Sequence, residues 1–222
     1  MNPAIELFTF QGSLFGWRVQ LALAINNVDY VCNYLDPVKG EHKAPDYVAL
    51  NPRGKVPLLK HGEFFVRESI AILVYLDSLY PEWQLFGNTS QEKAKIYQQV
   101  CEIDNIIVLP LFELIPPIFF GGIAGKEEEI IENFQKFKVE FTMLNDNISA
   151  DENWLAGDKL SAADIAIYPV VRFVEKLAAQ EDVSKLNIDI LPIQEKYPKL
   201  GNLVQKIDEM PNVESLYPPD WR

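Results

Sequence analysis

The segment Asn51–Pro57, which reads Asn-Pro-Arg-Gly-Lys-Val-Pro, constrains the fold of this chain more than any other feature. Gly54 permits a tight turn, and Pro57 has no N–H, so the two residues between them cannot pair as the interior of a normal strand. Eleven residues after Pro57, the pair Glu68-Ser69 opens an apolar run with helical spacing. Ser69 therefore lies where a helix begins. Bare backbone beside a helix start predicts a site for a small anionic peptide.

The first eighty residues alternate between strand-like and helix-like patterns. The predicted strands are residues 4–10, 30–35, 56–59 and 64–66, and the predicted helices are residues 16–26, 46–50 and 68–79. The last two strands are joined by a Gly-containing connection of hairpin length, so we expect them to pair antiparallel. The order β-α-β-α-β-β-α is that of a thioredoxin-like domain.

A turn-rich segment divides the chain. Residues 81–91 contain Gly, Asn, Thr and Ser between strongly periodic neighbours, which is typical of a linker. We therefore predict a first domain over residues 1–80 and a second over residues 92–222. Helical periodicity without a convincing strand predicts that the second domain is all-α, with helices at residues 92–109, 126–147 and 162–178. Ser161 and Asp164 have the spacing of a capping box, a folding device to which we assign no chemistry.

Composition and charge exclude several classes of function. The net charge of -12 argues against a nucleic-acid partner, since phosphate binding requires clustered Lys and Arg. Cys32 and Cys101 form no metal-ligand or C-x-x-C pattern, which indicates no metal and a reducing compartment. Residues 1–6 lack the features of a signal peptide, so we expect a cytoplasmic protein. The apolar segment 106–125 contains Glu113 and three prolines, which favours a kinked helix facing a pocket over a membrane span.

Taken together, the N-P-x-G-K-V-P motif, Glu68-Ser69, the linker and the L-S-x-A-D motif of the second half resemble the cytosolic glutathione transferases. The resemblance covers nearly the whole chain. It implies an α/β thioredoxin-like N-terminal domain plus an all-α C-terminal domain. It also implies an enzyme of detoxification that uses glutathione as a co-substrate without a metal, and a homodimer that binds neither nucleic acid nor membrane.

The resemblance assigns the centre of the glutathione site to four residues. It implies that Pro57 is cis and that the Val56 backbone pairs with the cysteinyl part of glutathione, a short form of strand addition. Ser69, at a helix N-terminus, would bind the γ-glutamyl carboxylate. Glu68 would accept from the γ-glutamyl ammonium, although without the resemblance it would be interpreted as simple capping.

The other end of glutathione falls to a basic loop. His42 and Lys43 resemble the pair with which phi-type members hold the glycine carboxylate, and Lys55 could reach the same end. A loop with His and Lys is otherwise ordinary solvated surface. We expect Arg18 to support this loop rather than to touch the ligand.

Members of this family differ in whether Tyr, Ser or Cys meets the sulfur of glutathione. No Tyr precedes Tyr30, no Cys precedes Cys32, and Ser13 is the only Ser in the first 68 residues. Residues 13–19, Ser-Leu-Phe-Gly-Trp-Arg-Val, resemble the S-P-F-x-x-R-V stretch of tau-type members. The resemblance therefore implies a serine-type enzyme (tau/phi/zeta-like) in which Ser13 donates to the thiolate. Dithiol redox chemistry is excluded here because position 13, which carries the reactive Cys in redox-active relatives, is a Ser.

The electrophilic co-substrate should lie between the two domains, against apolar side chains that exclude water. The candidates, each of which could equally be plain core, are Leu14, Phe15, Leu111, Phe112, Ile115 and Phe119.

Two alternatives stay open. The Trp-Arg-Val match at residues 17–19 suggests a glutathione-dependent isomerase of the zeta, maleylacetoacetate type, although the second Ser and the Cys of that family's S-S-C-x-W-R-V motif are absent. The second alternative is a non-enzymatic carrier or regulatory protein that keeps the fold. The intact glutathione motif argues against it.

Overall fold

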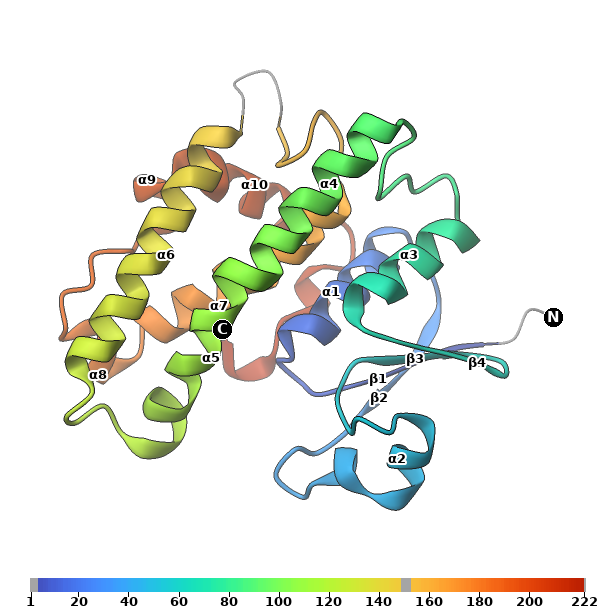
Figure 1. Cartoon of the computed structure of the whole chain (residues 1–222), viewed down its shortest axis with the longest axis horizontal. Coiled ribbons are helices and arrows are strands. Elements are labelled where there is room, and N and C mark those ends of the chain that lie inside the picture. Colours follow the sequence, from blue (N-terminus) through green and yellow to red (C-terminus); the bar gives the residue numbers. More distant parts are fainter. Residues whose placement is uncertain (1–3, 149–152, 222) are drawn as a thin grey trace. The chain divides into compact units, whose positions relative to one another are not determined.

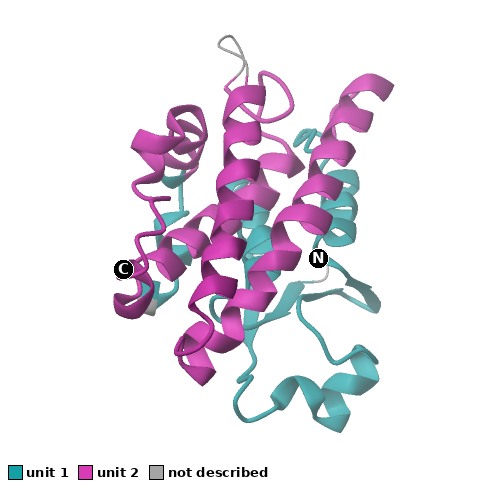
Figure 2. Ribbon diagram, turned by 60° about the vertical axis from the view of Figure 1, so that its left-hand side comes forward, with its two compact units in different colours: residues 1–85, 208–222 teal, residues 86–207 magenta. Residues whose placement is uncertain are grey.

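The computed structural model describes residues 4–148 and 153–221, which fall into two compact units (Figure 2). Unit 1 comprises residues 1–85 together with residues 208–222, and unit 2 comprises residues 86–207. The change from one unit to the other falls inside the segment 81–91. Residues 208–221 pack with unit 1, although their sequence predicts that they belong to the helical half. The domain limits 1–80, 81–91 and 92–222 stay a prediction.

Unit 1 is built on a four-stranded mixed sheet of order β2-β1-β3-β4 (Figure 1). The strands are β1 (Ile5–Thr9), β2 (Tyr30–Tyr34), β3 (Leu58–His61) and β4 (Phe64–Arg67). β1 pairs parallel with β2 and antiparallel with β3, and β3 pairs antiparallel with β4. The thioredoxin-like arrangement is confirmed.

Within residues 4–85, three helices and a short 3₁₀ turn accompany the sheet: α1 (Leu14–Ile25), the turn Glu41–Lys43, α2 (Pro45–Leu50) and α3 (Ser69–Leu79). Helices α1 and α3 pack on one face of the sheet, and α2 lies away from that face (Figure 1). The core consists of buried aliphatic side chains from the sheet and from these two helices, namely Ile5, Leu7, Val19, Leu23, Leu59, Ile72 and Leu76.

The approach of α1 to β1 depends on one glycine. A Cβ atom built on Gly16 would lie 1.8 Å from Oγ1 and 2.9 Å from Cβ of Thr9, whose side chain is fully buried. No larger residue fits there without moving the helix. Gly16 therefore sets how closely the first turn of α1 lies on the first strand.

Strand β3 starts later than its sequence predicts. Its first ladder residue is Leu58, which pairs with Phe8 on one side and Arg67 on the other. The prediction that the strand begins at Val56 is wrong, because Pro57 has no N–H to give to a ladder. The Val56–Pro57 peptide bond is cis, as the resemblance implies.

Unit 2 opens with one unbroken helical run over residues 90–121. It consists of α4 (Ser90–Glu102), a π-helical segment (Ile103–Ile107), α5 (Val108–Pro116) and a second π-helical segment (Pro117–Gly121). The helical pattern of residues 92–109 is therefore part of a longer helix, in agreement with the helix expected within residues 106–125. Pro110 falls in the first turn of α5 and Pro117 opens the second π-helical segment, where the hydrogen-bond register changes and a missing N–H costs little.

The same run is the one helix in the described part of the chain that is long and apolar enough to cross a membrane, by length and composition alone. Within its most apolar stretch, 33% of the residues are buried. A buried helix of a folded domain passes the same test, so this finding carries little weight.

The remaining helices of unit 2 are α6 (Glu127–Asn147), α7 (Ala162–Ala178), α8 (Glu181–Ser184), α9 (Ile193–Lys196) and α10 (Pro198–Asp208), the last of which continues one residue into unit 1. Two 3₁₀ turns, Glu214–Leu216 and Pro219–Trp221, follow. Among the described residues of unit 2 the only β pairing is an isolated bridge between Trp154 and Gly157. Helix α7 is buried along nearly its whole length. An all-helical second half is confirmed.

The capping box at the start of α7 is confirmed in detail. The Asp164 carboxylate is fully buried and accepts hydrogen bonds from the Leu155 and Ser161 N–H groups at 2.8 Å each, and from the Ser161 hydroxyl at 2.8 Å. Burial raises the pKa of Asp164 to about 6, against the opposite pull of these donors. The box therefore ties the segment before α7 to its first turn.

Candidate glutathione-binding site

Ser13 is the N-cap of α1. Its Oγ accepts a hydrogen bond from the Gly16 N–H at 3.2 Å, and its own N–H donates to the Phe10 carbonyl at 3.2 Å. The cap uses a lone pair of the hydroxyl oxygen and leaves its hydrogen free to donate elsewhere. The side chain is half-buried. One hydroxyl can thus start the helix and also stabilise an anion in front of it.

Ser69 is the first residue of α3 and is only 5% exposed. Its hydroxyl accepts from Arg18 Nη1 at 3.4 Å, across 51 positions of sequence. The Arg18 side chain is fully buried, and its guanidinium lies 4.9 Å from the centre of the Phe15 ring. A buried cation beside a helix N-terminus gives this point a positive potential, which favours a carboxylate.

Glu68 lies at the N-cap position of α3 with φ 67° and ψ 118°. This left-handed backbone is uncommon for a residue with a side chain. The carboxylate makes no capping hydrogen bond and is exposed. The simple capping interpretation of Glu68 is therefore wrong. Its backbone turns the side chain out to solvent beside Ser69.

The loop that contains Gly54 is tied to the 3₁₀ turn that carries His42 and Lys43. The Lys43 ammonium donates to the Gly54 carbonyl at 2.8 Å. Gly54 has φ 54°, and a Cβ atom there would lie 2.9 Å from the His42 carbonyl oxygen. His42 is half-buried, and its ring meets that of Phe10 edge-on at 5.0 Å. The predicted glycine-carboxylate residues are thus joined to the predicted cysteinyl segment.

Val56 follows Lys55, whose carbonyl accepts from the Tyr47 hydroxyl and from the Asn51 side-chain amide at 2.6 Å each. Within the described residues, the N–H and C=O groups of Val56 make no hydrogen bond. Buried Asn51 and Tyr47 therefore hold a short segment that keeps its own backbone groups available.

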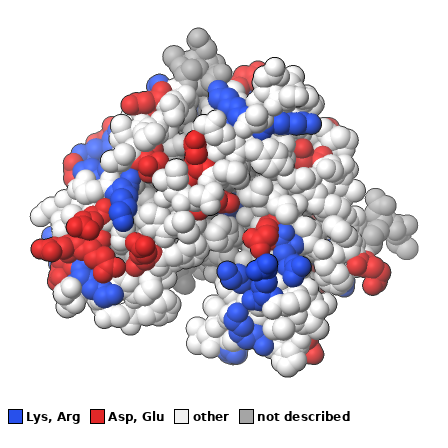
Figure 3. Space-filling model, in the orientation of Figure 1, with Lys and Arg blue, Asp and Glu red and all other residues white. Residues whose placement is uncertain are grey.

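The surroundings of this loop are basic. Figure 3 shows Lys and Arg side chains gathered over the part of unit 1 that holds α2. Lys43, Arg53 and Lys55 are exposed there, and no carboxylate among the described residues lies within ion-pair distance of them. These three basic side chains stand together on a chain whose net charge is -12.

The predicted co-substrate residues lie in both units. In unit 1, Leu14 is buried and Phe15 is half-buried under the Arg18 guanidinium. In unit 2, Leu111 is fully buried, Phe112 is 46% exposed, Ile115 is half-buried, and Phe119 is 39% exposed. Leu14 and Leu111 therefore have little surface left to offer a ligand.

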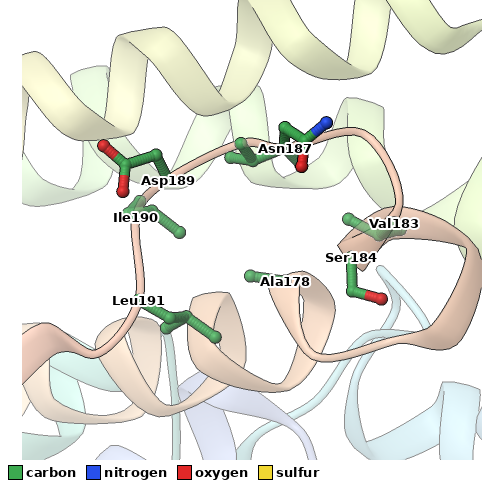
Figure 4. Close-up of a pocket in the computed structure, with 8 residues that line it drawn as sticks. Ala178, Val183, Ser184, Asn187, Asp189, Ile190 and Leu191 are labelled. Carbon is green, nitrogen blue, oxygen red and sulfur yellow. The ribbon is translucent and has the colours of Figure 1, made fainter.

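A pocket of about 330 Å³ lies elsewhere in unit 2, in the segment that follows α7 (Figure 4). Apolar Val183 and Ile190 and polar Ser184 and Asp189 line it. None of the residues predicted for the site lies there. The described residues contain no cluster of three or more His, Cys, Asp or Glu that could hold a metal ion.

Sequence reasoning missed the contact between Arg18 and Ser69. The expectation for Arg18 is support of the loop that carries His42 and Lys43, whereas it donates a hydrogen bond to Ser69 at the start of α3. The available signal was a cation within the apolar run that forms α1, because a charge on the buried face of a helix requires a partner.

Comparison with known proteins agrees with this geometry. Residues 3–78 match the family model "Glutathione S-transferase, N-terminal domain", and residues 103–211 match "Glutathione S-transferase, C-terminal domain". Glutathione S-transferase 1 of Dianthus caryophyllus is 30% identical over 75% of this chain and 76% of its own length. The maleylacetoacetate isomerase of Pseudomonas aeruginosa is 26% identical over 80% of this chain and 85% of its own.

Among solved structures, a glutathione S-transferase of the Antarctic clam Laternula elliptica superposes with a TM-score of 0.81 at 25% identity, covering 98% of this chain and 94% of the clam chain. Both halves of the chain, the sheet topology and the cis Val56–Pro57 bond point the same way. The chain therefore belongs to the glutathione S-transferase family and is a glutathione transferase that takes glutathione as its co-substrate.

Proposed function

We propose that Ser13 activates glutathione by donating its hydroxyl hydrogen to the sulfur and stabilising the thiolate. The observation that best supports this is the cap geometry, in which the Ser13 oxygen accepts from the Gly16 N–H and keeps its hydrogen. The N-terminus of α1 adds positive potential at the same point. The thiolate then forms a C–S bond with an apolar electrophile. Either a leaving group departs, or the electron pair of an activated double bond shifts and its carbon takes a proton.

The energy required is within reach of one hydrogen bond. Lowering the pKa of a thiol from about 8.5 to about 6.5 raises the thiolate fraction at pH 7 from roughly 3% to roughly 75%. This change corresponds to about 2.7 kcal/mol. A hydrogen bond to a charged group contributes about 1.5 to 3 kcal/mol.

For glutathione itself, we propose contacts along one side of unit 1. The unpaired backbone of Val56, held beside Pro57, pairs with the cysteinyl residue. Ser69, with Arg18 behind it, binds the γ-glutamyl carboxylate. Exposed Glu68 accepts from the γ-glutamyl ammonium.

We propose that the basic loop binds the glycine carboxylate of glutathione. Lys43 uses one donor on the Gly54 carbonyl and keeps two more for a carboxylate. His42 and Lys55 complete this end of the site. No carboxylate among the described residues lies within ion-pair distance of Lys43 or Lys55, which supports this assignment.

We propose that partly exposed apolar side chains bind the electrophile. These are Phe15 in unit 1 and Phe112, Ile115 and Phe119 in unit 2, each of which has solvent-exposed surface. Aromatic surface of this kind favours hydrophobic co-substrates.

Three variants of Ser13 test the mechanism through the thiolate absorbance of bound glutathione between about pH 5 and pH 9. Ser13→Ala removes the hydroxyl and the cap, and Ser13→Gly removes the hydroxyl at a capping cost of only a few tenths of a kcal/mol. Ser13→Thr keeps both. We expect the pKa of the bound thiol to rise by about 1 to 2 in the Ala and Gly variants and to stay low in Thr. A thiol that titrates alike in wild type and Ser13→Gly refutes the proposal.

A second candidate function is glutathione-dependent isomerisation, because one relative is named maleylacetoacetate isomerase. Isomerisation needs the thiolate to add and then leave, so the same Ser13 chemistry serves it. Measuring the glutathione left after turnover distinguishes the two functions, because an isomerase releases glutathione unchanged and a transferase consumes it. Leu14 and Phe15 occupy the positions of the second Ser and the Cys of the zeta motif, which favours transfer.

We also propose that the protein is a homodimer. The long helical run of unit 2 exposes large apolar side chains, among them Leu109 at 58% and Phe120 at 83%. Exposed apolar surface of this kind marks interaction sites. Light scattering of the wild type and of Leu109→Glu tests the proposal. A wild-type mass of one chain refutes it.

A further inference from the structure

Trp221 packs against both sides of the turn that carries Ser13. A Cβ atom built on Gly12, the residue before Ser13, would lie 3.5 Å from Nε1 and 3.6 Å from Cζ2 of Trp221. On the other side, the Ser13 carbonyl accepts from the Trp17 N–H at 2.8 Å, and the Trp17 and Trp221 rings meet edge-on at 5.4 Å and 82°. One indole thus meets the ring of the residue that is hydrogen-bonded to Ser13, and it stands over the side of Gly12 where a side chain would lie.

The segment that carries Trp221 is fixed along α1. The Asn212 side-chain amide donates to the Ala24 carbonyl at 3.2 Å and to the Asn27 side-chain oxygen at 2.9 Å, at the C-terminal end of the helix. Further along the segment, the Tyr217 hydroxyl donates to Asp208 at 2.8 Å, and its ring meets Trp17 edge-on at 5.2 Å. The segment therefore runs from the end of α1 back to its start, and all of these contacts lie within unit 1.

The turn itself has a weak point that this contact covers. Gly12 has φ 76° and no side chain, so nothing of its own restricts the backbone just before Ser13. A hydrogen bond prefers an angle at the hydrogen above about 150° and weakens steeply below about 120°. A rotation at Gly12 that moves the Ser13 hydroxyl out of this range would weaken its donation to an anion in front of it.

We propose that Trp221 is a positioning residue for thiol activation. Its indole restricts Gly12 and Trp17 and thereby holds the Ser13 hydroxyl in the orientation that donates to the sulfur of glutathione. The inference rests on the proposed role of Ser13. It extends the thiol-activating site to a side chain more than 200 positions away in sequence that need not touch glutathione.

The test compares Trp221→Ala, the conservative Trp221→Phe and a matched control, Trp83→Ala. Trp83 is a half-buried tryptophan of the same unit that stacks on Tyr80 at 4.8 Å. For each variant we would titrate the thiolate absorbance of bound glutathione and measure kcat and the KM for glutathione. We expect Trp221→Ala to raise the pKa of the bound thiol and to lower kcat about tenfold, with KM changed less than about twofold. Trp221→Phe should recover most of the loss, and Trp83→Ala should keep the wild-type thiol pKa.

Three results would overturn the inference: a wild-type thiol pKa in Trp221→Ala, an equal rise in Trp83→Ala, or no recovery in Trp221→Phe. If Trp221→Ala does not fold, Trp221→Leu replaces it, and a wild-type thiol pKa in that variant has the same meaning. Ser13→Gly separates the two proposals. If it leaves the thiol pKa unchanged, the Ser13 mechanism fails. If it raises the thiol pKa and Trp221→Ala does not, the positioning role alone fails.

Discussion

The buried carboxylate of Asp164 allows a quantitative prediction about pH and stability. Burial raises its pKa from 3.8 to about 6 in the folded protein. The folded state therefore binds the proton more tightly than the unfolded state. The resulting stability is fully present below pH 3.8 and is lost as the pH rises through about 6. The difference between these two pKa values corresponds to about 3 kcal/mol of the free energy of unfolding, which protonated Asp164 contributes at low pH.

Asp164→Asn removes this titration while keeping the shape of the side chain. It leaves the Ser161 N–H facing an amide N–H₂, so we expect a loss of roughly 1 to 3 kcal/mol at low pH, the cost of one unsatisfied buried donor. With rising pH the wild type weakens and the variant does not. The advantage of the wild type should therefore be larger at pH 5 than at pH 7.5, by roughly 1.4 kcal/mol.

Urea unfolding of both proteins at these two pH values measures the difference, and all other titrating groups cancel between them. An advantage that instead grows towards pH 7.5 would refute the reasoning. It would mean that the three donors to the carboxylate outweigh its burial and hold the pKa of Asp164 below its ordinary value.

Three further substitutions test the geometry of unit 1. Gly16→Ala should destabilise by about 2 kcal/mol or more because its Cβ meets the Thr9 side chain at 1.8 Å, and Thr9→Ala in the same chain should recover part of the loss in urea unfolding. Gly54→Ala should raise the KM for glutathione several-fold with little change in kcat, since it displaces the loop that carries Lys43; an unchanged KM contradicts this. Arg18→Met should weaken glutathione binding by roughly 2 kcal/mol in calorimetry, and Arg18→Lys by less, because the cation behind Ser69 is lost; equal affinity in folded Arg18→Met removes Arg18 from the site.

The fold could be predicted wherever the local backbone needs a conformation or a cap that only one or two residue types provide. Gly54, with φ 54°, and the pair of residues that caps α7 were identified from single positions. The errors came from sequence patterns that are compatible with two different local structures. Val56 belongs to a strand-like run but stands before Pro57, and helical periodicity was noted only to residue 109 although the helix continues through Pro110 in the first turn of α5.

The site was harder to predict because its contacts join distant parts of the chain. The residues assigned to glutathione and to the electrophile remain predictions, and local patterns could select them only through the family resemblance. No local pattern connects Arg18 with Ser69, or Gly12 with Trp221. Such pairs form only after α1 has packed on the sheet, so tertiary contact decides them.

The left-handed backbone at Glu68 has a consequence for engineering. With ψ at 118° it lies outside the small left-handed helical region, and a residue with a side chain costs about 1 to 3 kcal/mol there. Directed evolution for heat resistance alone is therefore expected to select glycine at position 68 and to discard the exposed carboxylate with it. A screen that also demands retention on immobilised glutathione would keep the acidic side chain and leave the extra heat resistance unused.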